Sequence, residues 1–125
     1  MEIAPLQLAG RQLILGYGKS GFLISDVQWR GAILVFPDRV MPWAVTGLQE
    51  VSLASFAPVR EYEPIPDIML IGTGSRMAML PSALRAELRS FGLAIETMDT
   101  GAACRTYNLL LGEERRVAAA LLPIH

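Results

Sequence analysis

The richest concentration of chemically useful side chains lies in residues 98–108. This segment brings together a carboxylate, a thiol, a guanidinium, two threonine hydroxyls, a phenol and an amide, in the order Met98-Asp99-Thr100-Gly101-Ala102-Ala103-Cys104-Arg105-Thr106-Tyr107-Asn108. It falls at a predicted strand-to-helix junction, and a helix N-terminus attracts anions and lowers the pKa of a nearby thiol. Cys104 can then act as a thiolate, and Arg105 can bind an anion.

A structural role for the same residues is the alternative. Asp99 can cap the helix, Cys104 can be a small buried apolar side chain, and Arg105 can lie at the surface or in an ion pair. Under the functional interpretation, the segment supplies five candidate ligand- or partner-binding residues: Asp99, Thr100, Cys104, Arg105 and Tyr107.

A second candidate site is the loop Gly72-Thr73-Gly74-Ser75, which follows an apolar run. Glycines let backbone N–H groups approach an anion, and open α/β sheets bind ligands beyond the carboxyl ends of their strands. The loop lacks the Gly-Lys-Ser/Thr of a phosphate-binding loop, and Met77 stands where a dinucleotide-binding fingerprint has its third glycine. Gly72, Thr73 and Gly74 are candidate binding residues, with a tight turn as the alternative.

Residues for metal-dependent or nucleophilic catalysis are scarce. The chain has one histidine, His125, and one cysteine, Cys104. A transition-metal site needs three or four converging ligands, and a Ser-His-Asp or Cys-His arrangement needs a histidine beside the nucleophile. Glu96 and Asp99 are an odd number of positions apart on an extended run, so they should face opposite sides. We therefore expect no metal, no cofactor and no catalytic set.

Trp43 follows Met41-Pro42 in a predicted loop. Tryptophan is more often a packing residue than a ligand platform, but this loop position favours exposure. Pro42 and Trp43 are therefore candidate surface interaction residues.

The first half of the chain has the pattern of short β-strands. Residues 13–17 and 22–24 are β-type runs separated by turn-forming residues, and residues 27–30 alternate between apolar and polar side chains. Residues 32–36 are apolar on both faces. This half predicts an antiparallel meander. In the proline-containing stretch that follows, residues 49–56 can form a short helix.

The second half predicts strands that alternate with helices. Residues 68–71 and 93–98 are strands joined by a helix that starts at Pro81 and ends at Gly92. Two strands joined in this way should lie parallel, with a right-handed crossover. Residues 102–111 are predicted to form a second helix, capped by Asp99 or Thr100 and ended by Gly112, and residues 117–122 a final buried strand. The expected fold is one α/β domain, residues 1–125, with a mixed central sheet, packed helices and an N-terminal antiparallel layer.

Bulk composition excludes several classes of function. The chain has 125 residues, of which 52% are hydrophobic and 18% charged, which suits one well-packed domain rather than a disordered segment. The net charge is −1 and the basic residues are scattered, whereas nucleic-acid binders cluster Lys and Arg. No run of about 18 apolar residues predicts a membrane span.

Cellular location follows from the same features. A single cysteine cannot form an internal disulfide, so nothing ties the chain to an oxidising compartment. The beginning, Met1-Glu2-Ile3-Ala4-Pro5, lacks the basic and apolar regions of a secretory signal. We expect a cytoplasmic protein.

Several motifs together resemble one family of small α/β proteins. The resemblance covers about residues 16–122 and rests on Gly16-Tyr17-Gly18, Gly21-Phe22, Pro42-Trp43, Leu70-Ile71-Gly72-Thr73-Gly74, residues 81–88 and, above all, residues 98–108. The family includes uncharacterised bacterial and archaeal proteins, a mitochondrial assembly factor for respiratory complex I and an adipogenesis-associated cytosolic protein. The resemblance implies a three-layer α/β fold around a mixed sheet, and it implies little about chemistry because no catalytic activity is established for the family.

Two functional hypotheses from different classes follow. The first is a non-enzymatic interaction module that binds a protein partner and helps to assemble a larger, respiratory-type complex; self-association is compatible with it. The second is a small-molecule or anion-binding protein, or a weak enzyme, that uses the Gly72 loop with Asp99, Cys104 and Arg105. A pocket shared by those segments favours the second hypothesis, whereas an exposed apolar patch around Pro42 and Trp43 favours the first.

Overall fold

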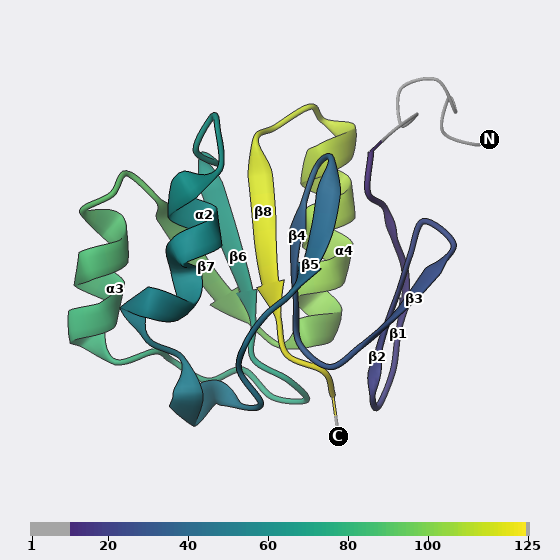
Figure 1. Cartoon of the computed structure of the whole chain (residues 1–125), viewed down its shortest axis with the longest axis horizontal. Coiled ribbons are helices and arrows are strands. Elements are labelled where there is room, and N and C mark those ends of the chain that lie inside the picture. Colours follow the sequence, from purple (N-terminus) through teal and green to yellow (C-terminus); the bar gives the residue numbers. More distant parts are fainter. Residues whose placement is uncertain (1–10, 125) are drawn as a thin grey trace.

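A five-stranded mixed sheet forms the centre of the computed structural model, which describes residues 11–124 (Figure 1). Its strands lie in the order β5-β4-β8-β6-β7 and span Ile33–Phe36 (β4), Arg39–Pro42 (β5), Ile68–Gly72 (β6), Ala94–Met98 (β7) and Val117–Leu121 (β8). β6 is parallel to β7 and to β8, whereas β4 is antiparallel to β5 and to β8. The predicted parallel pairing of residues 68–71 with residues 93–98 is confirmed.

A three-stranded antiparallel sheet forms the N-terminal layer, and it consists of β1 (Ile14–Tyr17), β2 (Gly21–Ile24) and β3 (Val27–Arg30). Tight turns set its register. The Gly18 N–H donates to the Gly21 carbonyl, and Ser25 and Asp26 both have positive φ in the two-residue turn before β3. Two successive positive φ values match the natural twist of a hairpin. The expected antiparallel layer is confirmed.

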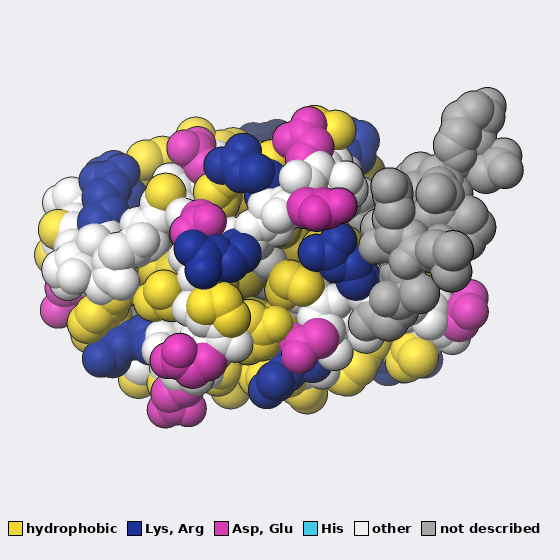
Figure 2. Space-filling view, turned by 90° about the horizontal axis from the view of Figure 1, so that it is seen from above, with side chains coloured by type: hydrophobic (Ala, Val, Ile, Leu, Met, Phe, Trp, Pro, Cys, Tyr) yellow, Lys and Arg dark blue, Asp and Glu magenta, His cyan; other side chains and the backbone are white. Residues whose placement is uncertain are grey.

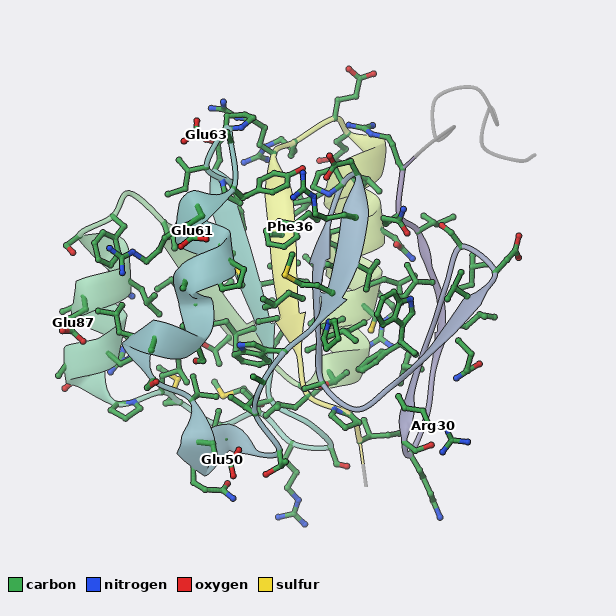
Figure 3. The ribbon with its side chains drawn as sticks, viewed as in Figure 1. Arg30, Phe36, Glu50, Glu61, Glu63 and Glu87 are labelled. Carbon is green, nitrogen blue, oxygen red and sulfur yellow. The ribbon has the colours of Figure 1, made fainter. Side chains whose placement is uncertain are left out.

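The prediction that residues 32–36 continue this meander is wrong. They form β4, which pairs with β8 in the central sheet. Leu34 and Phe36 pack into one buried cluster, whereas Ile33 and Val35 pack into the cluster on the opposite face. Figure 3 shows Phe36 inside the molecule, while the labelled Arg30, Glu50 and Glu87 lie at its periphery. A strand that is apolar on both faces needs cover on both sides, and only the central sheet provides it.

Helices cover both faces of the central sheet and complete the expected three-layer α/β fold. α2 (Ala57–Glu61) and α3 (Ser82–Arg89) contribute buried side chains to the cluster on one face. α4 (Thr100–Gly112) contributes to the other cluster and contacts β6, β8 and β1 (Figure 1). Within residues 11–124, no helix is long and apolar enough to cross a membrane.

The stretch between β5 and β6 differs from the expected short helix at residues 49–56. It holds two 3₁₀ turns, Leu48–Glu50 (η1) and Leu53–Phe56 (η2), and the α-helix begins only at Ala57. Ser52 and Ser55 form a reciprocal capping pair that starts a new turn at residue 53. Pro58 then occupies the first turn of α2, where a missing N–H costs no helical hydrogen bond.

The surface seen in Figure 2 carries charges of both signs side by side. Basic and acidic side chains alternate over this face, with apolar atoms between them. Two ion pairs occur within residues 11–124, Arg39–Asp38 and Arg116–Asp67, and both are solvent-exposed. This face has no broad basic area of the kind that binds a phosphate backbone.

Candidate functional site

The start of α4 is held by two adjacent polar side chains. Asp99 is the N-cap, as predicted, and its carboxylate accepts a hydrogen bond from the Ala102 N–H at 2.9 Å. Thr100 is fully buried. Its hydroxyl accepts from the Gly74 N–H at 2.8 Å and donates to the Leu122 carbonyl at 2.6 Å. Thr100 therefore ties α4 to the glycine loop and to the chain just after β8.

The glycine loop is shaped by this close approach. A Cβ at Gly72 would lie 2.9 Å from the Thr100 hydroxyl oxygen and 3.0 Å from Leu121, and Gly74 has a φ of +101°. The Thr73 hydroxyl donates to the Arg76 carbonyl at 2.6 Å and accepts from the Ala78 N–H at 3.0 Å. The tight-turn interpretation of this loop accounts for both glycines and for the threonine.

Cys104 and Tyr107 face the interior from α4. Cys104 is buried, and burial raises the pKa of its thiol to about 12, an effect that the Arg105 charge only partly opposes. The thiol is therefore neutral at physiological pH, as expected for a buried apolar residue rather than a thiolate. Tyr107 is fully buried, and burial raises the pKa of its hydroxyl. That hydroxyl has no hydrogen-bond partner among residues 11–124.

Arg105 points the opposite way, toward β1 and solvent. Its Nη1 donates to the Tyr17 hydroxyl at 3.3 Å. The same hydroxyl lies over Gly101, where an added Cβ would approach it within 2.6 Å. Neither of the two ion pairs within the described residues involves Arg105. Its guanidinium is thus positioned at the surface without an acidic partner in that part of the chain.

Asn108 is a residue whose role the sequence did not indicate. Its Oδ1 accepts from the Ile14 N–H at 3.0 Å, and its Nδ2 donates to the Ile14 carbonyl at 2.7 Å. The amide therefore satisfies both main-chain groups on the edge of β1, as a neighbouring strand would. Asn108 and Arg105 together hold β1 against α4, and we call this contact the β1–α4 seam.

The prediction that Trp43 is exposed is wrong. Trp43 is 4% exposed. Its Nε1 donates to the Ser55 carbonyl at 2.8 Å, and its ring packs against Phe56. A tryptophan N–H in the interior needs an acceptor, and the turn before α2 provides one. Pro42 is exposed at the end of β5, but the buried Trp43 ring does not add an exposed aromatic surface to it.

The two candidate segments face different cavities. A cavity of about 460 Å³ is lined by the loop at Thr73–Arg76 and the segment at Thr46–Gln49, together with Leu122 and Pro123. A cavity of about 150 Å³ lies in the β1–α4 seam and is lined by Cys104, Arg105 and Asn108 with residues 14–17. The structure therefore brings Asp99 and Thr100 to the glycine loop, but not Cys104 or Arg105.

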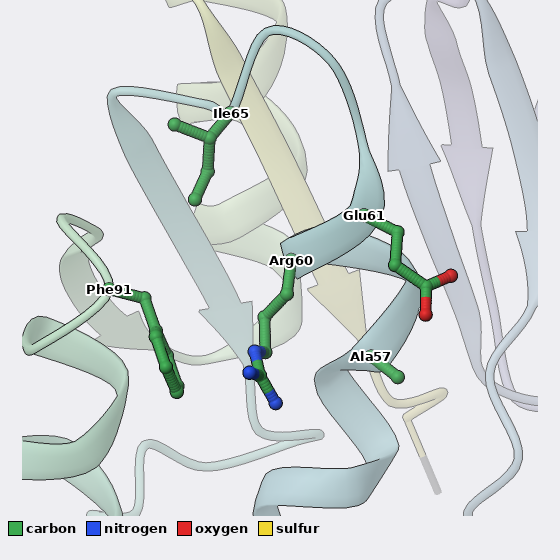
Figure 4. A pocket seen from close by; sticks show the side chains of 5 residues that line it. All are labelled: Ala57, Arg60, Glu61, Ile65 and Phe91. Atoms are coloured by element: carbon green, nitrogen blue, oxygen red, sulfur yellow. The ribbon is translucent and has the colours of Figure 1, made fainter.

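A third hollow involves no residue singled out from the sequence. It has a volume of about 340 Å³ and is lined by Ala57, Arg60, Glu61, Ile65 and Phe91. Figure 4 shows the Arg60 side chain turned toward Phe91 and the Glu61 carboxylate turned away. The Arg60 guanidinium lies 4.0 Å from the centroid of the Phe91 ring. This cation–π contact is an interaction of the Arg60 charge with the protein itself.

Metal ligands do not converge in the described part of the chain. Within residues 11–124, no three His, Cys, Asp or Glu side chains are grouped so that they could hold a metal ion. His125 lies outside the described residues.

Comparison with known proteins places this geometry in a family. The chain is 40% identical over 116 residues to an uncharacterized protein of Rhodobacter capsulatus, covering 93% of this chain and 88% of that one. It is 34% identical over 123 residues to human NADH dehydrogenase (ubiquinone) 1 alpha subcomplex assembly factor 3, covering 98% of this chain and 67% of the human protein. The frog assembly factor of the same name is matched over 58% of its length, so these relatives extend beyond the matched region.

A solved structure shows the same fold. The crystal structure of a Bartonella henselae protein, described as an outer membrane protein, superposes with a TM-score of 0.84 at 37% identity and covers 93% of this chain and 98% of that one. The family model described as "Protein of unknown function (DUF498/DUF598)" matches residues 14–122, from β1 to just beyond β8. The chain belongs to this DUF498/DUF598 family.

Proposed function

We propose that this protein is a non-enzymatic interaction module that assists the assembly of a larger respiratory complex of the complex I type. The observation that carries the proposal is the similarity to assembly factor 3, which at 34% identity extends over 98% of this chain. Its working partner is a protein, and its proposed location is the cytoplasm.

The chemistry of the α4 segment supports an interaction role over catalysis. One Asp99 carboxylate oxygen caps the start of α4, the Thr100 hydroxyl bonds to the glycine loop and to the Leu122 carbonyl, and the buried Cys104 thiol is held neutral. A nucleophilic cysteine reacts as an ionised thiol, and burial of Cys104 opposes that ionisation.

The experiment deletes the gene in its host and measures assembled complex I by native gel electrophoresis and NADH oxidation in membranes. We expect a severalfold loss of the assembled enzyme, with a second respiratory complex unchanged as the internal control. Restoration by the wild-type chain confirms that the loss comes from this gene. An unchanged level of complex I in the deletion strain contradicts the proposal.

A small-molecule binding role is the second candidate, and the cavity of about 460 Å³ favours it. The cavity lies beyond the carboxyl ends of β6 and β8, and its volume is within the usual range for ligand pockets. Arg76 is its charged lining residue. Native mass spectrometry of the purified chain tests this role, because a bound molecule that disappears in Arg76→Ala supports it and an unliganded mass in both argues against it.

A further inference from the structure

We infer that the β1–α4 seam is the docking surface of this module, and that its occupant is a partner-protein segment carrying acidic side chains beside apolar ones. This inference rests on the proposed function and names the surface through which it acts. It goes beyond the similarity to assembly factors, which identifies no surface.

Exposed apolar side chains mark the seam. Leu15 and Tyr17 on β1 are 52% and 41% exposed, and Leu109 on α4 is 62% exposed. Leu15 and Tyr17 line the seam cavity together with Arg105. Leu109 follows Arg105 by four positions and therefore lies on the same side of α4, one turn further along. The surface therefore combines two exposed leucines with an arginine and a tyrosine, and the last two are residue types enriched at interface hot spots.

The charges of the seam select an acidic partner. A second cavity of about 250 Å³ adjoins the first, because Gly16 and Tyr17 line both. Lys19 lines one cavity and Arg105 lines the other, and among residues 11–124 no acidic residue lines either. Neither cation belongs to an ion pair within residues 11–124. Acidic side chains of a partner would therefore meet one cation in each cavity, and the described fold leaves both cations without counter-charges.

The size of the cavities favours side chains over a free small molecule. At about 150 and 250 Å³, each cavity taken alone is below the lower end, about 300 Å³, of the range for small-molecule pockets, but each can receive one side chain of a partner. The residues that line the seam cavity are already held in place, because Asn108 binds both main-chain groups of Ile14. In addition, the Tyr17 hydroxyl lies close to Gly101 and accepts a hydrogen bond from Arg105. A preformed surface loses little conformational entropy on binding.

The two cations, Lys19 and Arg105, are too few to bind a nucleic acid or an anionic membrane. Nucleic-acid binding and attachment to an anionic membrane both draw on several lysines and arginines together. An acidic protein segment needs only a few contacts of this kind, because the apolar side chains provide the rest of the interface.

The first test uses charge reversal in the deletion strain. Arg105→Glu and Lys19→Glu should each lower assembled complex I at least threefold relative to the wild-type chain, and the double variant should lower it further. Arg89→Glu is the matched control, because Arg89 is also exposed but lies on α3, on the other face of the central sheet. Melting temperatures of the purified variants should stay within about 4 °C of the wild type, which separates lost docking from lost folding.

The second test identifies the occupant without relying on complex I. A photo-crosslinking amino acid at Leu109 is compared in living cells with one at Met77, which is similarly exposed but belongs to the loop before α3. We expect a crosslink from position 109 alone, to a protein segment rich in Asp or Glu, and lost at least fivefold in Arg105→Glu. Changing one partner acid to lysine should restore that crosslink.

The outcomes separate the two proposals. If deletion leaves complex I unchanged while position 109 still crosslinks to an acidic segment, the proposed function fails and the docking surface stands. If deletion lowers complex I but the charge-reversed variants restore it fully, the docking surface is overturned. Crosslinks from position 109 to lipid or nucleic acid, or equal crosslinking from positions 77 and 109, also overturn it.

Discussion

Asn108 on α4 binds both the N–H and the carbonyl of Ile14, a residue 94 positions earlier in the chain. The edge of β1 would otherwise present these two groups without strand partners, since β1 pairs only with β2 within its sheet. A single side-chain amide thus joins the three-stranded layer to the helix that packs on the central sheet. Asn108 and Arg105 serve this attachment, whereas Asp99 and Thr100 hold the start of α4.

Asn108→Ala should lower the free energy of unfolding by about 1–3 kcal/mol, because it leaves both main-chain groups of Ile14 without their partner. Asn108→Asp should also be less stable than the wild type, since a carboxylate still accepts from the N–H but its second oxygen repels the Ile14 carbonyl oxygen. Urea unfolding measures both. Leu109→Ala is the control, because its exposed side chain should change stability by less than about 0.5 kcal/mol. Equal losses for Asn108→Ala and Leu109→Ala would contradict this role.

The parallel pairing of β6 with β7 could be predicted because its signals are local. Residues 68–71 and 117–122 are uninterrupted apolar runs, and the helix between residues 81 and 92 makes its two flanking strands parallel. β5 was not predicted, since four residues with Pro42 at the end have no pattern of their own. Its strand character comes from pairing with β4, which is a tertiary effect.

The candidate site was predictable in composition but not in role. The role of Asp99 as N-cap depends on Ala102, which is only three positions away. The sequence could therefore indicate this role. The partners of Thr100, Arg105 and Asn108 lie 22 to 94 positions away, so no spacing rule points to them. Trp43 was misplaced for the same reason, because its burial depends on Ser55 and Phe56.

Gly72→Ala should destabilise the protein by about 1–3 kcal/mol, because the new methyl group would press on Thr100 and Leu121 in a fully packed region. Gly112→Ala is the matched control. An added Cβ at Gly112 meets nothing within 4 Å, and alanine has the higher helix propensity, so stability should stay equal or rise by up to about 1 kcal/mol. Thermal or urea unfolding compares the two. A neutral Gly72→Ala would show that the loop can move away from Thr100.

Tyr107→Phe should leave the free energy of unfolding unchanged or raise it by about 1 kcal/mol. The substitution removes a buried hydroxyl that has no hydrogen-bond partner among the described residues, and keeps the ring that fills the core. Tyr62→Phe makes the same chemical change at a hydroxyl that does form a hydrogen bond, since it donates to Asp38 at 2.6 Å. Its free energy of unfolding should therefore fall by about 1 kcal/mol. If Tyr107→Phe lowers the free energy of unfolding by more than about 1 kcal/mol, the Tyr107 hydroxyl has a hydrogen-bond partner after all.

The Cys104 thiol should make stability fall with pH in a defined window. Burial raises the pKa of this thiol from its ordinary 9.0 to about 12 in the folded protein. Below pH 9 the thiol is neutral in both the folded and the unfolded chain, so its contribution to stability is complete. As the pH rises from 9 toward 12, the unfolded chain releases the proton while the folded chain keeps it, and the free energy of unfolding decreases.

The difference between the wild type and Cys104→Ala isolates this effect between pH 9 and pH 10. The two tyrosines with raised pKa, Tyr62 and Tyr107, ionise in the unfolded chain only around pH 10, and both are present in both proteins. Over this one pH unit, the wild type should lose about 1 kcal/mol more than Cys104→Ala in urea unfolding. A thiol-specific reagent at pH 8 should likewise modify Cys104 only after unfolding. Rapid modification of the folded protein, together with parallel stability curves, would mean that the thiol is accessible and ionises normally, which would reopen a chemical role for Cys104.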